Sequence, residues 1–157
     1  MKTIVIALTL TLAAPALAGD EAAVNYPKGF RGWQHVKSMV INPGHPLHAA
    51  VGGIHHIYAN PAALKGYRTR QWADGSVIVF DLFEAVDAGN AVSEGPRKAV
   101  VVMERNARRF ASTDGWGFQV FDPATRKGTI DGKAAAGCAA CHAGRKAEGF
   151  VFSELRD

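Results

Sequence analysis

The sequence predicts a single α+β domain, in which an antiparallel β-sheet is flanked by a few helices. Three observations support this class. Runs of β-branched and aromatic residues are typical of strands, and short segments rich in Gly, Asn, Asp and Pro separate them. These separating segments have the character of turns, which suffice to join antiparallel strands. An Ala-rich segment near the C-terminus favours a helix after the last strand.

The first 18 residues have the pattern of a cleaved export signal. Lys2 supplies a positive charge, residues 4–12 are almost wholly apolar, and Ala16 and Ala18 form an A-x-A cleavage site. We therefore expect residues 1–18 to be a signal peptide and residues 19–157 to be one domain, exported to the periplasm. The apolar stretch is too short for a transmembrane helix, so no membrane span is expected. The net charge of +4 does not indicate nucleic acid binding.

The first elements are predicted from periodicity and from breaking residues. Pro27 suits the first turn of a helix. Apolar residues recur at helical spacing after it, which predicts a helix over residues 27–39. The Asn-Pro-Gly-His-Pro run at 42–46 forms a turn-rich loop, and residues 51–59 are predicted to form a strand.

Asn60 and Pro61 form the N-cap and the first position of a short helix, which is expected to end at Gly66. The remaining predicted elements are strands over 76–84, 98–104 and 116–121, loops over 88–96 and 122–132, one or two helical turns over 106–111, and a helix over 133–144.

Cys138, Cys141 and His142 form a Cys-x-x-Cys-His motif in this C-terminal helix. Covalent attachment of c-type haem requires this spacing, because each thiol forms a thioether with one vinyl group and the histidine reaches the iron. A redox disulfide of the thioredoxin type would lie near the start of a βαβ unit, and a zinc site would need a second pair of ligands. We therefore predict one covalent haem c with His142 as its axial ligand.

The sequence offers no evident sixth ligand for the iron. Fifteen residues follow His142, and none of them is Met or His. An upstream ligand would have to be Met39, Met103, a histidine or a lysine, and Met103 lies in an apolar strand where a core role is more common. We expect a five-coordinate haem with an open distal side. Such a protein binds gases, carries electrons or acts as a haem enzyme.

The other histidines differ in their expected exposure. His45 and His48 flank Pro46 and are expected at the surface, and His35 is expected on the polar side of the first helix. His55 and His56 are consecutive on a strand, so they point to opposite faces and one of them faces the interior. That histidine is either a satisfied core residue or a group that donates a hydrogen bond, or acts as an acid or base, beside the haem.

Six segments, taken in order, resemble the cytochrome P-460 and cytochrome c′-beta family. They are YPKGFRGW at 26–33, IYANP at 57–61, DGSVIV at 74–79, GWGF at 115–118, the Cys-x-x-Cys-His motif, and FVFS at 150–153. The resemblance spans the mature chain, and the ordered set is more specific than any one member. It implies a mostly β-sheet fold, a homodimer, and a five-coordinate haem c with an open distal site.

Within the family that this chain resembles, two groups of members differ at one position. Hydroxylamine-oxidising members carry a lysine, cross-linked to the haem, on the strand after the Asp-Gly turn, and Phe80 stands at the matching position here. A phenyl ring cannot form that cross-link, so the chain is closer to the cytochrome c′-beta members, in which aromatic side chains cap the iron. The second capping aromatic would fall at residues 47–51, where there is none. His55 matches an arginine of the cross-linked members, and Glu104 is a candidate for their acidic distal residue.

Three functions stay open at this point. The favoured one is binding of nitric oxide, and of carbon monoxide, because both bind ferrous haem without needing a hydrogen bond and Phe80 would make the distal side apolar. The alternative is oxidation of hydroxylamine, in which His55 and Glu104 would be the catalytic groups. The third is plain electron transfer, in which the mildly basic surface would attract an acidic redox partner protein.

Overall fold

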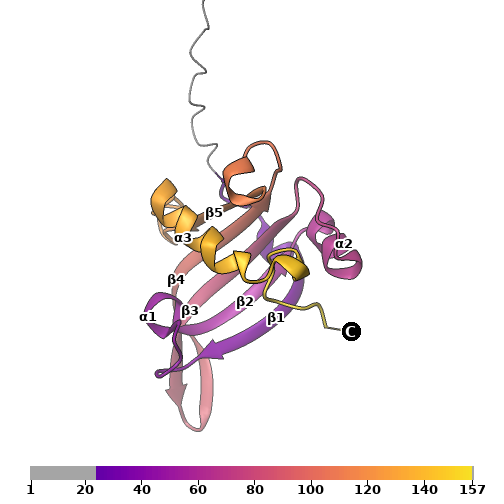
Figure 1. The fold of residues 1–157 in the computed structure, drawn as a ribbon. Coiled ribbons are helices and arrows are strands. Elements are labelled where there is room, and N and C mark those ends of the chain that lie inside the picture. Colours follow the sequence, from indigo (N-terminus) through magenta and orange to yellow (C-terminus); the bar gives the residue numbers. More distant parts are fainter. Residues whose placement is uncertain (1–23, 157) are drawn as a thin grey trace, which may run out of the picture.

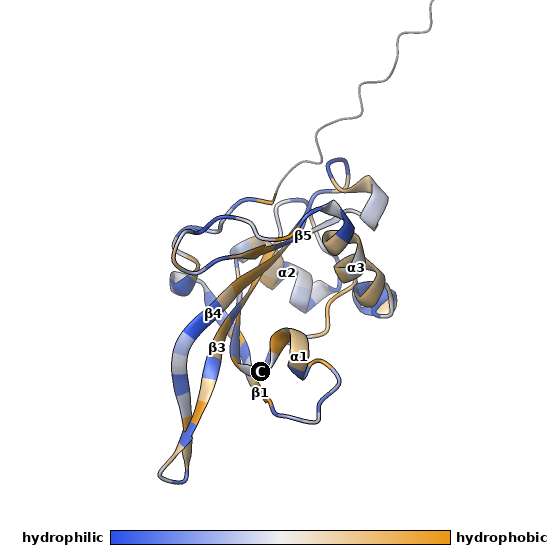
Figure 2. Cartoon of the chain, turned by 90° about the vertical axis from the view of Figure 1, so that its left-hand side faces the viewer, coloured by the Kyte–Doolittle hydropathy of each residue, from blue (hydrophilic) through white to orange (hydrophobic). Residues whose placement is uncertain are grey.

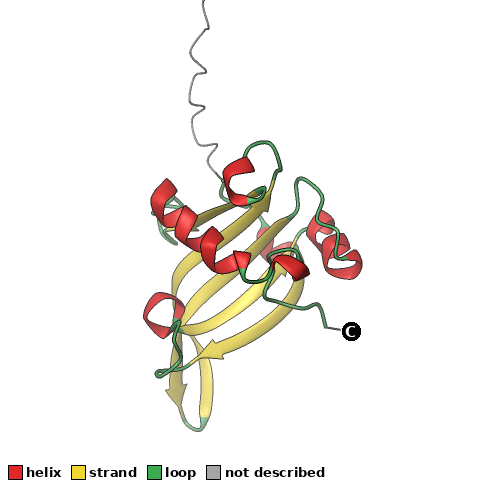
Figure 3. Cartoon of the chain, viewed as in Figure 1, coloured by secondary structure: helices red, strands yellow, loops and turns green. Residues whose placement is uncertain are grey.

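The computed structural model describes residues 24–156, so the predicted signal peptide lies outside the described residues. The chain forms a five-stranded antiparallel sheet whose strands are neighbours in chain order (Figures 1 and 3). The strands are β1 (Gln34–Ile41), β2 (Gly53–Ala59), β3 (Val77–Ala88), β4 (Ala91–Arg105) and β5 (Trp116–Phe121). The predicted α+β class is confirmed, and β5 has the predicted bounds.

Three α-helices accompany the sheet within the described part of the chain, and Figures 1 and 2 place them on the same face of it. They are α1 (His48–Val51), α2 (Pro61–Thr69) and α3 (Gly132–Ala143), and the 3₁₀ turns are η1 (Phe30–Gly32), η2 (Ala111–Thr113) and η3 (Lys146–Glu148). Within residues 24–156, no helix has the length and apolar character that crossing a membrane requires.

The predicted helix over residues 27–39 is wrong. The structure has the three-residue turn η1 there, followed by β1. Gly29 (φ 74°) and Trp33 (φ −82°, ψ 172°) depart from helical geometry on either side of that turn. A register shift in β1 follows His35, where Val36 is left without a partner in β2. This bulge interrupts the alternation of a strand, which is why the apolar spacing resembled that of a helix.

The loop predicted over residues 88–96 is also wrong, because β3 and β4 continue through it as a hairpin. Gly89 and Asn90 both have φ of 61° and form its two-residue turn. Left-handed conformations at both positions match the twist of the flanking strands. Pro96 is tolerated beside the register shifts around Phe83, since proline within a sheet occurs mainly at edges and bulges.

Smaller differences concern the helices. Asn60 caps α2 as expected, accepting a hydrogen bond from the backbone N–H of Ala63 at 2.9 Å. The helix continues past Gly66 to Thr69, and Arg70 ends it with φ of 59°. The helical turns predicted over 106–111 are irregular turns that precede η2. Tertiary contacts outweigh the local signals here, because Gly66 is buried inside α2.

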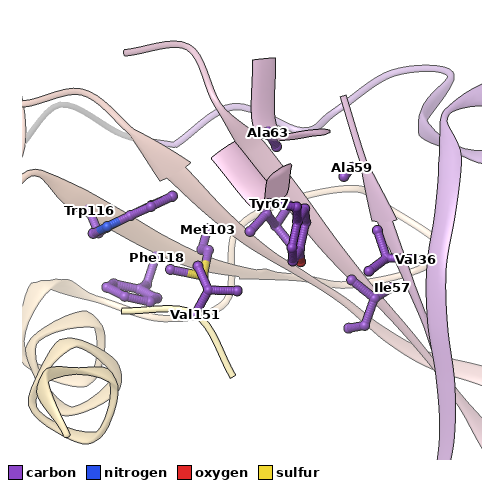
Figure 4. Packing of buried hydrophobic residues seen from close by; sticks show 10 residues of the cluster. Val36, Ile57, Ala59, Ala63, Tyr67, Met103, Trp116, Phe118 and Val151 are labelled. Atoms are coloured by element: carbon purple, nitrogen blue, oxygen red, sulfur yellow. The ribbon is translucent and has the colours of Figure 1, made fainter. Parts of the chain in front are cut away.

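The sheet has a core on each face. The core on the helical face, the first core, joins β-strands to α2 and to the C-terminal segment (Figure 4). It comprises Val36, Ile57, Ala59, Ala63, Tyr67, Ile78, Met103, Trp116, Phe118 and Val151. The second core, on the opposite face, comprises Val24, Phe30, Val79, Val100, Val102, Phe110 and Phe121. Val24 and Phe30, the latter in η1, thus help to cover the face that the α-helices leave open.

A buried ion-pair network lies outside both cores, on the face opposite the α-helices. The Asp81 carboxylate is fully buried and pairs with Arg31 Nε at 3.0 Å and Arg97 Nε at 2.8 Å. Both guanidinium groups also lie over the ring of Phe83, at 5.2 and 5.1 Å from its centroid. Two partners on different elements stabilise the buried charge and tie η1 to β3 and β4.

Candidate haem site

The cysteines of the motif lie three residues apart in α3, so they face the same side of the helix. The helix begins at the Asp131 cap, whose side chain accepts a hydrogen bond from the N–H of Ala134 at 2.9 Å. Both cysteines are free thiols; Cys138 is half-buried against the first core and Cys141 is exposed. Burial raises the pKa of the Cys138 thiol. Redox Cys-x-x-Cys pairs have lowered pKa values, so this environment does not favour a redox disulfide.

His142 presents one ring nitrogen for a metal. Its Nδ1 lies 2.6 Å from the carbonyl oxygen of Phe150, so Nδ1–H donates there and Nε2 is left for a ligand. The ring packs between Phe118 and Phe152, with centroids 5.0 and 4.9 Å away. Burial lowers the pKa of His142, which favours the neutral imidazole that binds iron.

His55 and Phe80 come together on the helical face of the sheet, from the neighbouring strands β2 and β3. Their rings are stacked, with centroids 3.9 Å apart and planes 16° from parallel. His55 is 3 % exposed, and its Nδ1 has no hydrogen-bond partner among the described residues. Desolvation, together with smaller contributions from the neighbouring His56 and Lys37, lowers the pKa of His55 to about 4. The imidazole is therefore neutral at physiological pH.

The structure decides between the two adjacent histidines. His56 points to the opposite face, where its Nδ1 lies 2.6 Å from Ser38 Oγ and its Nε2 lies 2.7 Å from Glu94 Oε1. His35 lies on β1 rather than on a helix, and its Nε2 is 2.9 Å from the same Ser38 Oγ. His55 is thus the histidine that faces the side of the sheet carrying α3.

The strand register places His142, His55 and Phe80 on one face. Phe118, which contacts His142, is paired through β4 with Ile78, two residues before Phe80 on β3. Phe80 is in turn paired with Ile57, two residues after His55 on β2. Residues directly opposite, or two apart along a strand, share a face. An axial histidine and two stacked rings therefore border the same surface.

Several apolar side chains on this side of the molecule are only partly covered. Phe80, Val101 and Val120 are paired in a row across the sheet and are half-buried. Met39 and Phe152 are 46 % and 52 % exposed. A flat apolar macrocycle would cover such side chains, and His142 Nε2 and the two thiols offer the bonds it needs. The residues present therefore fit a haem c.

Residues 47–51, where the resemblance would place a second capping aromatic, contain α1. Leu47, just before α1, is 47 % exposed, and the helix itself has no buried residue. Figures 1 and 2 show α1 on the same face as α3. An aliphatic side chain therefore stands where the resemblance would place an aromatic one.

The structure does not bring every candidate to this face. Glu104 points to the opposite side, next to Met103 in sequence, and pairs with Arg109 at 2.6 Å. Met103 is 8 % exposed and belongs to the first core. His45 is exposed, and His48, which is half-buried, begins α1.

Sequence reasoning missed the contacts on the far side of His142. Phe118, the Phe150 carbonyl and the Phe152 ring all surround the imidazole. The apolar run at 150–152 was a visible signal that this segment packs inward. The backbone hydrogen bond was not visible, because it depends on the path of the chain after α3.

Two cavities, of about 400 and 410 Å³, lie elsewhere on the molecule. One lies between β5, the segment around Phe110 and the start of α3, and the other between Asn42 and the β3–β4 hairpin. Neither is lined by Cys138, His142 or Phe80. The candidate haem site is an open face bordered by α3 and α1 rather than either of these hollows.

Comparison with known protein families decides the identity. The family model for cytochrome P460 matches residues 27–153, which is most of the chain. This chain belongs to the cytochrome P460 family. No curated protein matches it. Membership makes it a haem-binding cytochrome, and the two cysteines of α3 fit the haem c motif expected from the sequence.

Proposed function

We propose that this cytochrome P460-family protein binds nitric oxide, and carbon monoxide, at a five-coordinate haem c whose only protein ligand is His142. One observation carries the proposal: the stacked Phe80 and His55 rings share the face of the sheet with His142. When bound, haem supplies an iron that binds diatomic gases; the residues around it decide which gases bind and how tightly.

The proximal side supports one strong protein ligand. The Nδ1–H of His142 donates to the Phe150 carbonyl, which orients the ring and raises the basicity of Nε2. The Cys138 and Cys141 thiols lie on the same helix, at the positions that would attach the macrocycle. Phe118 and Phe152 pack against the imidazole.

The distal residues favour ligands that need no hydrogen bond. Phe80 offers no acid or base, and the lowered pKa of His55 keeps its imidazole uncharged. Carbon monoxide and nitric oxide bind ferrous haem without a polar donor, whereas bound oxygen carries negative charge and gains from one. A Phe80 cover therefore disfavours oxygen and slows peroxide cleavage relative to gas binding, whereas a hydrogen bond from the neutral His55 would act in the opposite direction.

The proposal includes the expectations that the sequence raised about the whole protein. Residues 1–18 would direct export to the periplasm, where haem would be attached covalently. The family resemblance adds a homodimer, and the mildly basic surface would attract an acidic redox partner protein.

The absorption spectrum of the purified, haem-loaded protein tests this function. We expect high-spin ferric and ferrous spectra and a shift of the ferrous spectrum when nitric oxide is added. A low-spin spectrum that is indifferent to the gas would reject the proposal and favour electron transfer. Replacing Met39, which is 46 % exposed on the same face, should leave the spectra unchanged. A change would identify Met39 as the sixth ligand.

A second candidate function rests on His55. Its buried Nδ1 lacks a partner among the described residues and could donate to, or accept from, a polar nitrogen substrate such as hydroxylamine. Turnover of hydroxylamine with an electron acceptor would support this function. The whole-protein mass distinguishes the cross-linked type, because a mass equal to chain plus haem, joined by thioethers alone, excludes a lysine cross-link.

A further inference from the structure

The segment that follows α3 returns to the histidine of its own motif. The turn η3 reverses the chain, and the N–H of Phe150 donates to the carbonyl of Arg145 at 2.7 Å. Phe150 then presents its carbonyl oxygen 2.6 Å from His142 Nδ1. The next residue, Val151, is 3 % exposed in the first core, beside Phe118 and Met103 in Figure 4. The carbonyl is therefore held between a closed turn and a buried anchor.

The backbone that presents this carbonyl is strained. Gly149 has φ of 72° and Phe150 has φ of 69°. The left-handed region suits glycine, but a bulky aromatic residue rarely adopts it, because Cβ approaches the following carbonyl oxygen. Such conformations persist only where the surrounding structure imposes them, and they gather at functional sites. The strain at Phe150 coincides with the hydrogen bond from its carbonyl to the imidazole of His142.

Trp72 packs directly on this turn. A Cβ on Gly149 would lie 2.2 Å from Trp72 Nε1 and 2.3 Å from its Cδ1, so the indole lies directly on the glycine. Its Nε1 has no hydrogen-bond partner among the described residues, so the indole acts by packing.

The indole is itself held in place by α2 and the first core. A Cβ on Gly66 would lie 2.4 Å from Trp72 Cε3, so this buried glycine makes room for the six-membered ring. The rings of Tyr67 and Trp116 lie 4.9 and 5.6 Å away, centroid to centroid. The contacts run from α2 through Trp72 to Gly149, and so to the Phe150 carbonyl.

We propose that Trp72 and Gly149 are positioning residues that fix the Phe150 carbonyl on His142 Nδ1 and thereby set the strength of the iron–histidine bond. A short hydrogen bond from Nδ1–H moves electron density into the ring and makes Nε2 a stronger donor. A stronger donor stabilises ferric iron relative to ferrous iron and lowers the reduction potential. The inference rests on haem bound at His142 and is independent of which gas binds.

Replacing Gly149 by Ala in the haem-loaded protein tests this role. The added Cβ must displace Trp72 or the 149–150 backbone, which lengthens the hydrogen bond to His142. We expect a lower iron–histidine stretching frequency in the resonance Raman spectrum of the ferrous protein, and a higher midpoint potential. Gly137→Ala is the matched control: Gly137 lies in α3, the helix that carries His142, and an added Cβ would meet nothing within 4 Å. It should leave both values unchanged.

Trp72→Phe provides a second variant in case Gly149→Ala does not load haem. It removes the ring edge that covers Gly149 and should shift both values in the same direction, by less. A folded, haem-loaded Gly149→Ala or Trp72→Phe protein with the frequency and potential of the wild type would overturn the inference. If the wild-type protein does not bind nitric oxide but the variants show the shifts in stretching frequency and midpoint potential, the proposed function is rejected and this inference stands.

Discussion

The imidazole of His55 lies stacked on the phenyl ring of Phe80, with 3.9 Å between the ring centroids. The two residues come from neighbouring strands and are not a directly opposed pair, since His55 is opposite Leu82 and Phe80 is opposite Ile57. The stack therefore bridges two rows of the sheet. It places a neutral polar ring against an apolar ring on the face where the haem is expected. Substitution of Phe80 or of His55 tests the role of each ring.

Removing the Phe80 ring should open the distal side. We expect Phe80→Ala to speed association of carbon monoxide with the ferrous haem by roughly tenfold, which corresponds to about 1.4 kcal/mol in the barrier. Flash photolysis measures this rate. Tyr58→Ala is a suitable control, because Tyr58 is also a half-buried ring but packs on the second core. Equal rates in the wild type and Phe80→Ala would show that Phe80 does not cover the iron.

The pKa of His55 predicts how stability depends on pH. Because the folded-state pKa of about 4 lies below the ordinary histidine value of 6.5, the unfolded chain binds more protons between these values. The stability from neutral His55 is therefore complete above about pH 6.5 and is lost as the pH falls toward 4, by up to about 3 kcal/mol.

Denaturant unfolding of the haem-loaded protein between pH 4 and 7 measures this dependence. His55→Leu should flatten the curve, whereas replacement of the exposed His45 by Gln should not. A curve of unchanged slope in His55→Leu would assign the dependence to other groups.

Asp81 should be a large contributor to stability on the opposite face. Its carboxylate is fully buried between Arg31 and Arg97. Asp81→Asn removes the buried charge that the two guanidinium groups share, and we expect a loss of about 3 kcal/mol in the free energy of unfolding. Asp87→Asn, in the exposed part of the hairpin, should change it by less than about 0.5 kcal/mol. Similar effects of the two substitutions would mean that the network contributes little.

The thioethers can be counted by mass. Cys141→Ser should leave haem attached through Cys138 alone, so denatured protein still carries the mass of haem. The double variant Cys138→Ser, Cys141→Ser should release its haem on denaturation, because only the His142 bond would remain. Haem that stays with the denatured double variant would point to another covalent bond. Haem lost from the denatured wild type would reject covalent attachment.

The sequence predicted some elements well because their signals are local. The strand over 116–121, the Asn60 cap and the C-terminal helix are each specified by consecutive residues, and the structure contains all three. The prediction of a helix over 27–39 is wrong because a bulge in β1 interrupts the alternation of apolar residues that identifies a strand. The prediction of a loop over 88–96 is wrong because pairing between β3 and β4 outweighs the preference of its turn-forming residues.

By itself the sequence determined the chemistry of the motif, since Cys138, Cys141 and His142 are brought together by one helix whatever the rest of the chain does. Only the tertiary structure decided that His55 rather than His56 faces the helices, because a shift of one residue in strand register exchanges the two faces. The same holds for the Phe150 carbonyl on His142, which depends on a strained turn that Trp72 holds in place. A site formed by residues close together in the chain can be predicted from their spacing, whereas contacts across the sheet depend on the packing of the whole domain.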